Sequence, residues 1–157
     1  MPELDDADCR ILAVLQADGR ISNVDLADRV VLSPSPCLRR VRRLEEAGVI
    51  QGYRAILDRE AVGLGLTVFV AIKVARHSRE AAMTLQETLA AIPEVAACHM
   101  VSGEADFLAE VVVADLAAYE RLLTEQLLTL PMIADIRSNM VLRRIKSDGA
   151  PPLPKRP

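Results

Sequence analysis

Five arginines that no acidic residue interrupts are the densest group of chemically versatile side chains in this sequence. They lie between Asp28 and Glu45, and they are Arg29, Arg39, Arg40, Arg42 and Arg43. A guanidinium group grips a phosphate, or the O6 and N7 atoms of guanine, through two parallel hydrogen bonds. A charge run is usually a solvated helix face, but such faces normally carry acids at i,i+4 spacing. We therefore expect an uncompensated cationic surface that binds a polyanion.

Three short helices are expected to position these arginines. The apolar spacing predicts helices over residues 5–18, 22–30 and 36–47. Ser22 and Asp25 form a capping-box pattern at the start of the second helix. Ser35 is the expected N-cap of the third helix, because a residue before proline avoids helical geometry and Pro36 suits the first helical position.

The third helix has an apolar side and an arginine side. At about 100° per residue, the apolar side holds Leu38, Val41 and Leu44. Arg39 and Arg43 then lie opposite, with Arg40 and Arg42 on the flanks. In a helix-turn-helix, the second helix of the pair lies in the major groove and its first residues reach the base edges. The arrangement predicts a DNA-binding domain.

The hydrophobic period changes after Gly63 and Gly65. Strands are predicted over residues 67–74, 95–102, 107–113 and 133–145, and helices over residues 80–92 and 116–130. The order βαββαβ is that of a ferredoxin-like domain. The predicted class is therefore α+β, with a helix-turn-helix (winged-helix-like) domain over 1–50, an extended linker over 51–66, the βαββαβ domain over 67–147 and a flexible tail over 148–157.

The first predicted strand is apolar on both faces. Val68, Val70 and Ile72 share one face, whereas Phe69 and Ala71 occupy the other. A sheet covered by helices on one side normally leaves its second face polar. A second copy of the chain would cover the apolar second face, so we predict a homodimer.

Several stretches of the sequence resemble the Lrp/AsnC family of transcription factors. In the N-terminal part they are Gly19-Arg-Ile-Ser-Asn-Val-Asp-Leu-Ala, Leu32-Ser-Pro-Ser-Pro-Cys-Leu, Arg40-Val-Arg-Arg-Leu-Glu and Gly48-Val-Ile-Gln-Gly-Tyr53. The later stretch Cys98-His-Met-Val-Ser-Gly-Glu-Ala-Asp-Phe107 resembles the hairpin of the family's effector domain. The resemblance covers residues 4 to 146 and follows the leucine-responsive branch.

This resemblance implies a sequence-specific regulator that binds double-stranded DNA, forms dimers that assemble into tetramers or octamers, and binds an amino-acid effector between dimers. The implied DNA-facing residues are Ser33, Ser35, Pro36, Cys37, Arg39, Arg40 and Arg43. The implied effector-binding residues are Met100, Val101, Ser102, Gly103, Glu104 and Asp106, with Asn139 and Met140 expected at the border of the same crevice. No enzymatic activity, cofactor or metal is implied.

Two residues depart from the family pattern. Val31 stands in the turn where glycine is common, and a β-branched residue resists positive φ. Glu104 stands where the family usually has aspartate, so its extra methylene could reshape the pocket. A plain turn accounts for the hairpin. The added hypothesis is that N–H groups around Gly103 bind the effector's carboxylate, that Asp106 accepts its ammonium group, and that Met100 contacts its side chain.

The remaining composition excludes other classes. The chain has 157 residues, 51% of them hydrophobic, and a formal net charge of -3, which rules out disorder as the main state. Three dispersed cysteines and two histidines, His77 and His99, predict neither a disulfide framework nor a metal site. No signal peptide or membrane span is expected, so the location is cytoplasmic, at the nucleoid. An effector-independent architectural DNA-binding protein stays open, whereas a small ferredoxin-like enzyme lacks a catalytic constellation.

Overall fold

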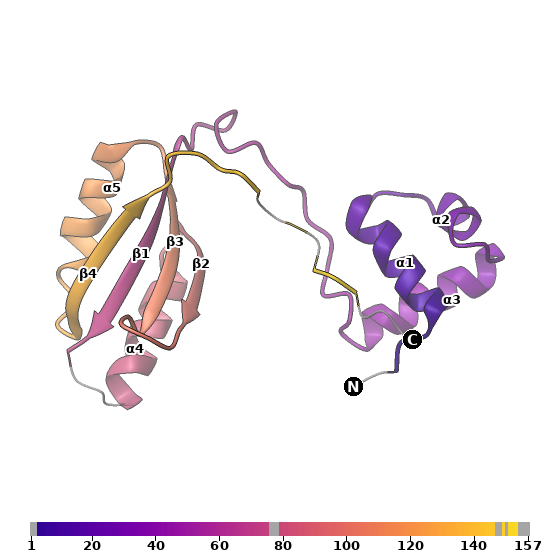
Figure 1. Cartoon of the computed structure of the whole chain (residues 1–157), viewed down its shortest axis with the longest axis horizontal. Helices are drawn as coiled ribbons and strands as arrows, with labels where there is room; N and C mark the ends of the chain where they lie inside the picture. Colours follow the sequence, from indigo (N-terminus) through magenta and orange to yellow (C-terminus); the bar gives the residue numbers. More distant parts are fainter. Residues whose placement is uncertain (1–2, 76–78, 147–148, 150, 154–157) are drawn as a thin grey trace. The chain divides into compact units, whose positions relative to one another are not determined.

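The computed structural model describes residues 3–75, 79–146, 149 and 151–153, so His77 lies outside the described residues. The chain divides into two compact units, Met1–Ile56 with Lys146–Pro157, and Leu57–Ile145 (Figure 1). Within the described residues, no helix is long and apolar enough to cross a bilayer.

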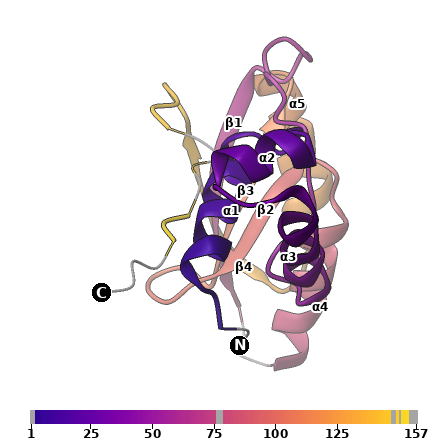
Figure 2. The same cartoon turned by 90° about the vertical axis from the view of Figure 1, so that its right-hand side faces the viewer.

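The described part of the N-terminal unit contains three helices around one core, and Figure 2 shows them in front. They are α1 (Asp6–Ala17), α2 (Asn23–Arg29) and α3 (Pro34–Glu46). As the sequence predicts, Ser22 caps α2, and its side chain accepts a hydrogen bond from the Asp25 N–H. Asp5 caps α1 in a reciprocal capping box with Asp8. The fully buried side chains of Ile11, Val30 and Leu44 pack in the centre of the unit.

Helix α3 begins one proline earlier than predicted. Its N-cap is Ser33, not Ser35, and Pro34 occupies the first helical turn together with Pro36. Both prolines are tolerated because the first four N–H groups of a helix have no intrahelical acceptor. The Ser33 side chain makes no capping hydrogen bond. The third helical residue, a usual donor to the cap, is here a proline without an N–H.

The turn between α2 and α3 carries the strain that Val31 implies. Val31 adopts a φ of 56°, the only non-glycine residue with positive φ in the described part of the chain. Its side chain is 85% exposed. The strained conformation therefore has no compensation from packing of the valine side chain.

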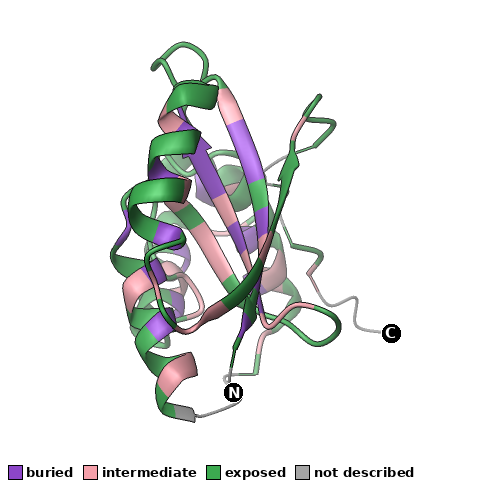
Figure 3. Cartoon of the chain, turned by 90° about the vertical axis from the view of Figure 1, so that its left-hand side faces the viewer, coloured by how far each residue is buried: buried purple, intermediate pink, exposed green. Residues whose placement is uncertain are grey.

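The C-terminal unit is a four-stranded antiparallel sheet with helices on one face (Figure 1). Its elements are β1 (Leu66–Val74), α4 (Arg79–Ala91), β2 (Val95–Met100), β3 (Phe107–Val113), α5 (Leu116–Leu122), the π-helical turn η1 (Leu123–Leu127) and β4 (Ile133–Met140). The strand order β2-β3-β1-β4 confirms the ferredoxin-like plan. Buried residues lie on both helices and strands, where the two layers form the core (Figure 3).

Two elements are three or more residues shorter than predicted. The helix after Leu116 changes to a π-helical turn, in which the Leu128 N–H donates to Leu123. Its i→i+5 spacing brings Leu122 and Leu127 to the same buried side. Strand β4 ends at Met140 because β1, its partner, begins only at Leu66, and the last cross-strand bond runs from the Val141 N–H to Thr67.

The C-terminal segment contacts the three-helix core of the N-terminal unit, to which it belongs. Leu153 is half-buried against the core of the N-terminal unit, and the side chain of Gln16 donates to the carbonyl of Pro151 at 3.3 Å. These contacts involve residues 151–153, and the flexible tail over 148–157 stays a prediction. Residues 147–148, 150 and 154–157 of that predicted tail lie outside the described residues.

Candidate nucleic-acid interface and hairpin pocket

Helix α3 is rotated relative to the predicted helical wheel. Its buried side centres on Cys37 and Leu44, which are 0% and 1% exposed. Leu38, predicted to face the core, is instead exposed. Cys37, predicted to face DNA, is therefore a packing residue, and burial raises the pKa of its thiol. That prediction is wrong because the buried side depends on where α1 and α2 pack, which apolar spacing within α3 does not specify.

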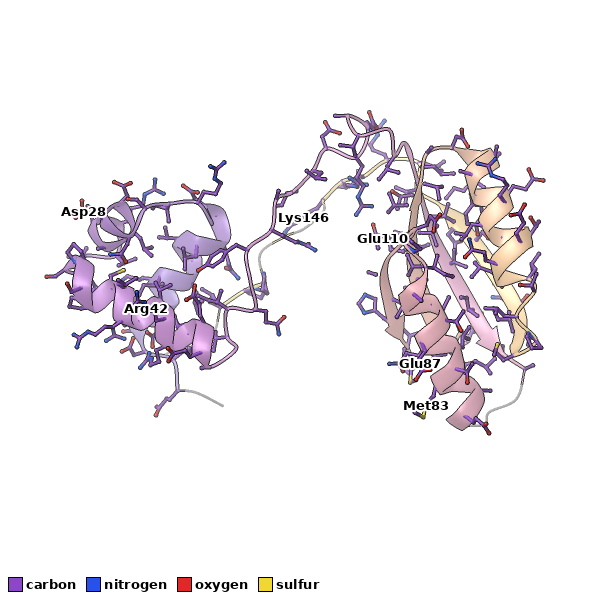
Figure 4. The ribbon with its side chains drawn as sticks, turned by 180° about the vertical axis from the view of Figure 1, so that it is seen from behind. Asp28, Arg42, Met83, Glu87, Glu110 and Lys146 are labelled. Atoms are coloured by element: carbon purple, nitrogen blue, oxygen red, sulfur yellow. The ribbon has the colours of Figure 1, made fainter. Side chains whose placement is uncertain are left out.

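The side of α3 opposite its core forms one continuous exposed surface, which we call the outer face. Its members are Ser35, Leu38, Arg39 and Arg42, and the exposed Glu46 continues it at the end of the helix (Figure 4 labels Arg42). Within the described part of the chain, Arg39 and Arg42 form no ion pair. The prediction of uncompensated charge therefore holds for these two arginines. The predicted site omitted Leu38 and Arg42, although the helical period alone places Arg42 one turn from Arg39.

Arg40 and Arg43 are compensated, contrary to the prediction. Arg40 Nη1 lies 2.7 Å from Asp5 Oδ2 and 2.9 Å from Asp8 Oδ1. Arg43 Nη2 contacts the other oxygen of Asp8, Oδ2. The Asp8 side chain is 0% exposed, so two guanidinium groups neutralise a fully buried carboxylate. The acids that neutralise Arg40 and Arg43 are Asp5, the N-cap of α1, and Asp8 in its first turn, more than thirty residues earlier in the sequence.

These contacts shift two pKa values in opposite directions. The pKa of Asp5 falls from 3.8 to about 2, first because the Asp8 N–H donates to its carboxylate and second because Arg40 does. The pKa of Arg40 is raised, first by its hydrogen bond to Asp5 and then by its bond to Asp8. Hydrogen bonds to an ionised group favour the ionised form. Both groups therefore remain charged across the physiological range.

The start of α3 is held by a polar contact from α2. Asn23 Nδ2 donates to the carbonyl of Pro34 at 3.0 Å. Ser33 and Ser35 are exposed beside this contact, and Pro36 is half-buried. The bond fixes the first turn of α3 against α2, which places the two exposed hydroxyl groups at the end of the helix that enters the major groove in helix-turn-helix proteins.

The hairpin between β2 and β3 is tied to the end of β1. Asp106 Oδ2 accepts a hydrogen bond from the Val74 N–H at 2.8 Å, and the Val101 N–H donates to the carbonyl of Asp106. Gly103 has a φ of 128°, which only glycine adopts readily. One oxygen of Asp106 therefore holds the fold together, rather than standing free for an effector's ammonium group.

Glu104, the departure from the family pattern, reaches across to β4. Its Oε2 accepts from Arg137 Nη1 at 2.7 Å, and Arg137 Nε lies 3.3 Å from Asp135 Oδ2. These hydrogen bonds, first the one to Glu104, raise the pKa of Arg137. The three charged groups border a depression of about 250 Å³, here called the hairpin pocket. It is lined by Ala71, Lys73, Glu104, Ala105, Asp135 and Arg137.

The structure does not bring Asn139 and Met140 to this pocket. They pair with Phe69 and Val68, which lie two and three residues before Ala71 of the pocket, about 7 and 10 Å along β1 at the strand rise of 3.3 Å per residue. As neighbours on one strand they also point to opposite faces. The predicted effector crevice lies between dimers, so the expectation that Asn139 and Met140 border it stays a prediction. Met100, Ser102 and Gly103 are exposed at the hairpin but do not line the pocket.

A helix-turn-helix unit with an arginine-bearing outer face, followed by a ferredoxin-like domain with a charged pocket, defines a two-domain transcriptional regulator. The comparisons agree: residues 4–51 match the winged helix-turn-helix DNA-binding model, and residues 67–151 match the Lrp/AsnC ligand binding domain. The chain belongs to the Lrp/AsnC family. It is a DNA-binding transcriptional regulator with a ligand-binding domain.

Individual relatives share nearly the whole chain. The leucine-responsive regulatory protein of Escherichia coli strain K12 is 45% identical over 147 residues, which cover 94% of this chain and 90% of the relative. A transcriptional regulator from Neisseria meningitidis, solved with L-methionine, is 39% identical with a TM-score of 0.89, covering 92% of this chain and 94% of that one. An AsnC family regulator from Agrobacterium tumefaciens is 38% identical with a TM-score of 0.90, covering 95% and 97%.

Proposed function

We propose that the outer face of α3 contacts double-stranded DNA in the major groove. The observation that carries this proposal is the position of Ser35, Leu38, Arg39 and Arg42 on one exposed side, opposite the buried Cys37 and Leu44. Arginine suits guanine edges and phosphates, and an aliphatic side chain such as Leu38 suits the methyl group of thymine. Ser33 and Pro36 border this face at the start of the helix, and Arg40 and Arg43 lie at its rim.

Two experiments together test this interface. Genome-wide mapping of bound sites identifies a specific DNA fragment, and fluorescence anisotropy then measures the Kd of the protein for that fragment. We expect Arg39→Ala to raise the Kd for a specific site by about ten- to a hundredfold, the cost of one lost base contact. Arg121→Ala is the matched control, because it removes the same charge from an exposed position of α5. Equal loss in both variants would show that only net charge matters and would remove α3 from the interface.

The DNA-binding form is proposed to be a homodimer. The sheet face away from the helices carries Phe69, which is 39% exposed, and the half-buried Ala71 and Leu108. A second copy would cover this apolar surface and present two α3 helices to half-sites about one helical turn apart. Further assembly to tetramers or octamers would add avidity. Sedimentation equilibrium tests the dimer, and Phe69→Asp is expected to yield monomers.

The effector is proposed to be an amino acid bound at the hairpin pocket. Lys73 and Arg137 can bind its carboxylate, and Glu104 and Asp135 can accept hydrogen bonds from its ammonium group. The solved Neisseria meningitidis relative in complex with L-methionine supports this ligand class. Calorimetric titration with each amino acid tests it. If none gives heat or a change of assembly, the protein is an effector-independent architectural DNA-binding protein. Either function places it in the cytoplasm, at the nucleoid.

A further inference from the structure

We infer that Asp8 is a positioning residue for DNA binding: it orients the guanidinium group of Arg43 toward a DNA phosphate. The inference rests on the proposed function of α3. It assigns a role in DNA recognition to a residue of α1, which is not one of the two helices, α2 and α3, of the helix-turn-helix. Its basis is the asymmetric way in which Asp8 binds its two arginines.

Asp8 is fully committed inside the unit. One oxygen, Oδ1, accepts from Arg40 at 2.9 Å, and the other, Oδ2, accepts from Arg43 and from the Asp5 N–H at 3.1 Å. The carboxylate is 0% exposed, and its backbone N–H donates to Asp5 Oδ1. A side chain with both oxygens bonded and no contact with water holds one rotamer. It is therefore a fixed anchor in the first turn of α1.

Arg43 uses only part of its guanidinium group on this anchor. Its side chain is 55% exposed, against 30% for Arg40, and its contact with Asp8 is through Nη2 alone. Within the described residues, Nε and Nη1 of Arg43 have no partner. A guanidinium group is planar and carries five N–H donors, so one edge can bond to a carboxylate while another binds a phosphate. Arg40, by contrast, bonds to both Asp5 and Asp8, so of the two arginines it is the one with a structural role.

Pre-orientation of this kind aids binding because a long side chain loses rotamer freedom when it is immobilised at an interface. Arg43 has already lost that freedom in the free protein. Asp8 should therefore strengthen DNA binding even though it adds a negative charge near a polyanion. If only net charge mattered, removal of the Asp8 charge would instead strengthen DNA binding. The sign of the effect of an Asp8 substitution on the Kd therefore tests the inference.

The test compares Asp8→Asn with Asp5→Asn in the full-length protein, using a DNA fragment that the wild-type protein binds. Both variants remove one negative charge from the start of α1, but of the two arginines Asp5 contacts Arg40 and not Arg43. We expect Asp8→Asn to raise the Kd about three- to tenfold and to lower the salt slope by about 0.9 per lost phosphate contact. Asp5→Asn should leave the salt slope unchanged, and its Kd should be unchanged or slightly lower.

A double-mutant cycle separates positioning from a general structural role. In an Arg43→Ala background, Asp8→Asn should have no further effect on the Kd, because Asp8 acts through Arg43. Full additivity would overturn the inference, and so would an Asp8→Asn protein that binds as tightly as Asp5→Asn. If Asp8→Asn does not fold, Arg43→Lys replaces it. An unchanged Kd for Arg43→Lys would overturn the inference, because lysine lacks the fork that binds two partners. If the wild-type protein binds no DNA, the proposed function itself fails.

Discussion

The two units contain the same interaction in two different environments. In the N-terminal unit, Arg40 meets Asp8 at 2.9 Å, and the Asp8 side chain is fully buried. In the C-terminal unit, Arg137 meets Glu104 at 2.7 Å, but these side chains are 66% and 85% exposed. The shorter pair is the weaker one, because water solvates both of its partners when they separate. A buried carboxylate loses that alternative, so its arginines cannot leave without cost. The buried cluster of Asp8, Arg40 and Arg43 therefore stabilises the fold. In the exposed pair, by contrast, Arg137 can exchange Glu104 for a ligand.

Removing both arginines of the buried cluster should produce the largest effect. Arg40→Ala combined with Arg43→Ala leaves the Asp8 carboxylate without a countercharge. We expect the free energy of unfolding to fall by about 3–5 kcal/mol, the cost of a broken buried ion pair. Chemical denaturation followed by circular dichroism measures it. Arg39→Ala combined with Arg42→Ala is the matched control, because it removes the same charge from the same helix.

The exposed pair provides the second half of this comparison. Arg137→Ala should not shift the denaturation midpoint measurably, because both partners remain hydrated. Arg137→Ala should instead weaken amino-acid binding in calorimetric titration. The comparison of the two clusters would fail if Arg137→Ala destabilised the protein as strongly as the Arg40 and Arg43 double variant.

The next largest effect is expected at Asp106, which distinguishes the two acids of the hairpin. Asp106→Ala removes the acceptor of the Val74 N–H and should lower the free energy of unfolding by about 1–3 kcal/mol. Glu104→Ala removes only a solvated ion pair and should leave the thermal unfolding temperature unchanged. Equal destabilisation by both substitutions would show that Glu104, too, holds the hairpin to the sheet.

The sequence predicts the elements of both units better than their contacts. Local periodicity and capping patterns identify all three N-terminal helices and the βαββαβ order, because these signals act over a few residues. They do not reveal that Asp8 neutralises Arg40 and Arg43, because that contact joins residues more than thirty positions apart. The rotation of α3 that buries Cys37 is likewise set by the neighbouring helices.

The candidate sites show the same limit. The arginine surface follows from the sequence, but the division between the free Arg39 and the bound Arg40 does not. The hairpin is predicted as a site, yet Lys73, Asp135 and Arg137 enter its pocket only through strand pairing. Asn139 pairs with Phe69 and does not line this pocket, and the register of β4 that places it there cannot be read from its own residues.

Each unit also contains a turn residue with positive φ, and substitutions there should change the free energy of unfolding less than the substitutions above. Val31 and Gly103 have φ values of 56° and 128°, but only one of them is glycine. Val31→Gly should raise the free energy of unfolding by about 1 kcal/mol, because removal of the Cβ relieves left-handed strain and outweighs the added backbone entropy. Gly103→Val should have the opposite sign. Thermal unfolding of both variants checks the pair, and a destabilised Val31→Gly would mean that the turn carries no strain.

The smallest expected effect is the pH dependence of the N-terminal cluster. The pKa of Asp5 is about 2 in the folded protein and 3.8 without its partners. A carboxylate with a depressed pKa contributes stability above its unfolded value, and this contribution disappears as the pH falls from about 4 to about 2. Because the Asp5 side chain is 51% exposed, solvent screening should keep the contribution below about 1 kcal/mol.

Asp5→Asn isolates this contribution, because asparagine caps a helix as well as aspartate but does not titrate. In thermal unfolding at a series of pH values, the wild-type protein should be the more stable at pH 5. The difference between the two proteins should then shrink toward pH 2. If the two proteins were equally stable at pH 5, Asp5 would act only as a helix cap. Its contact with Arg40 would then resemble the exposed pair of Arg137 and Glu104, and Asp8 alone would account for the stability of the buried cluster.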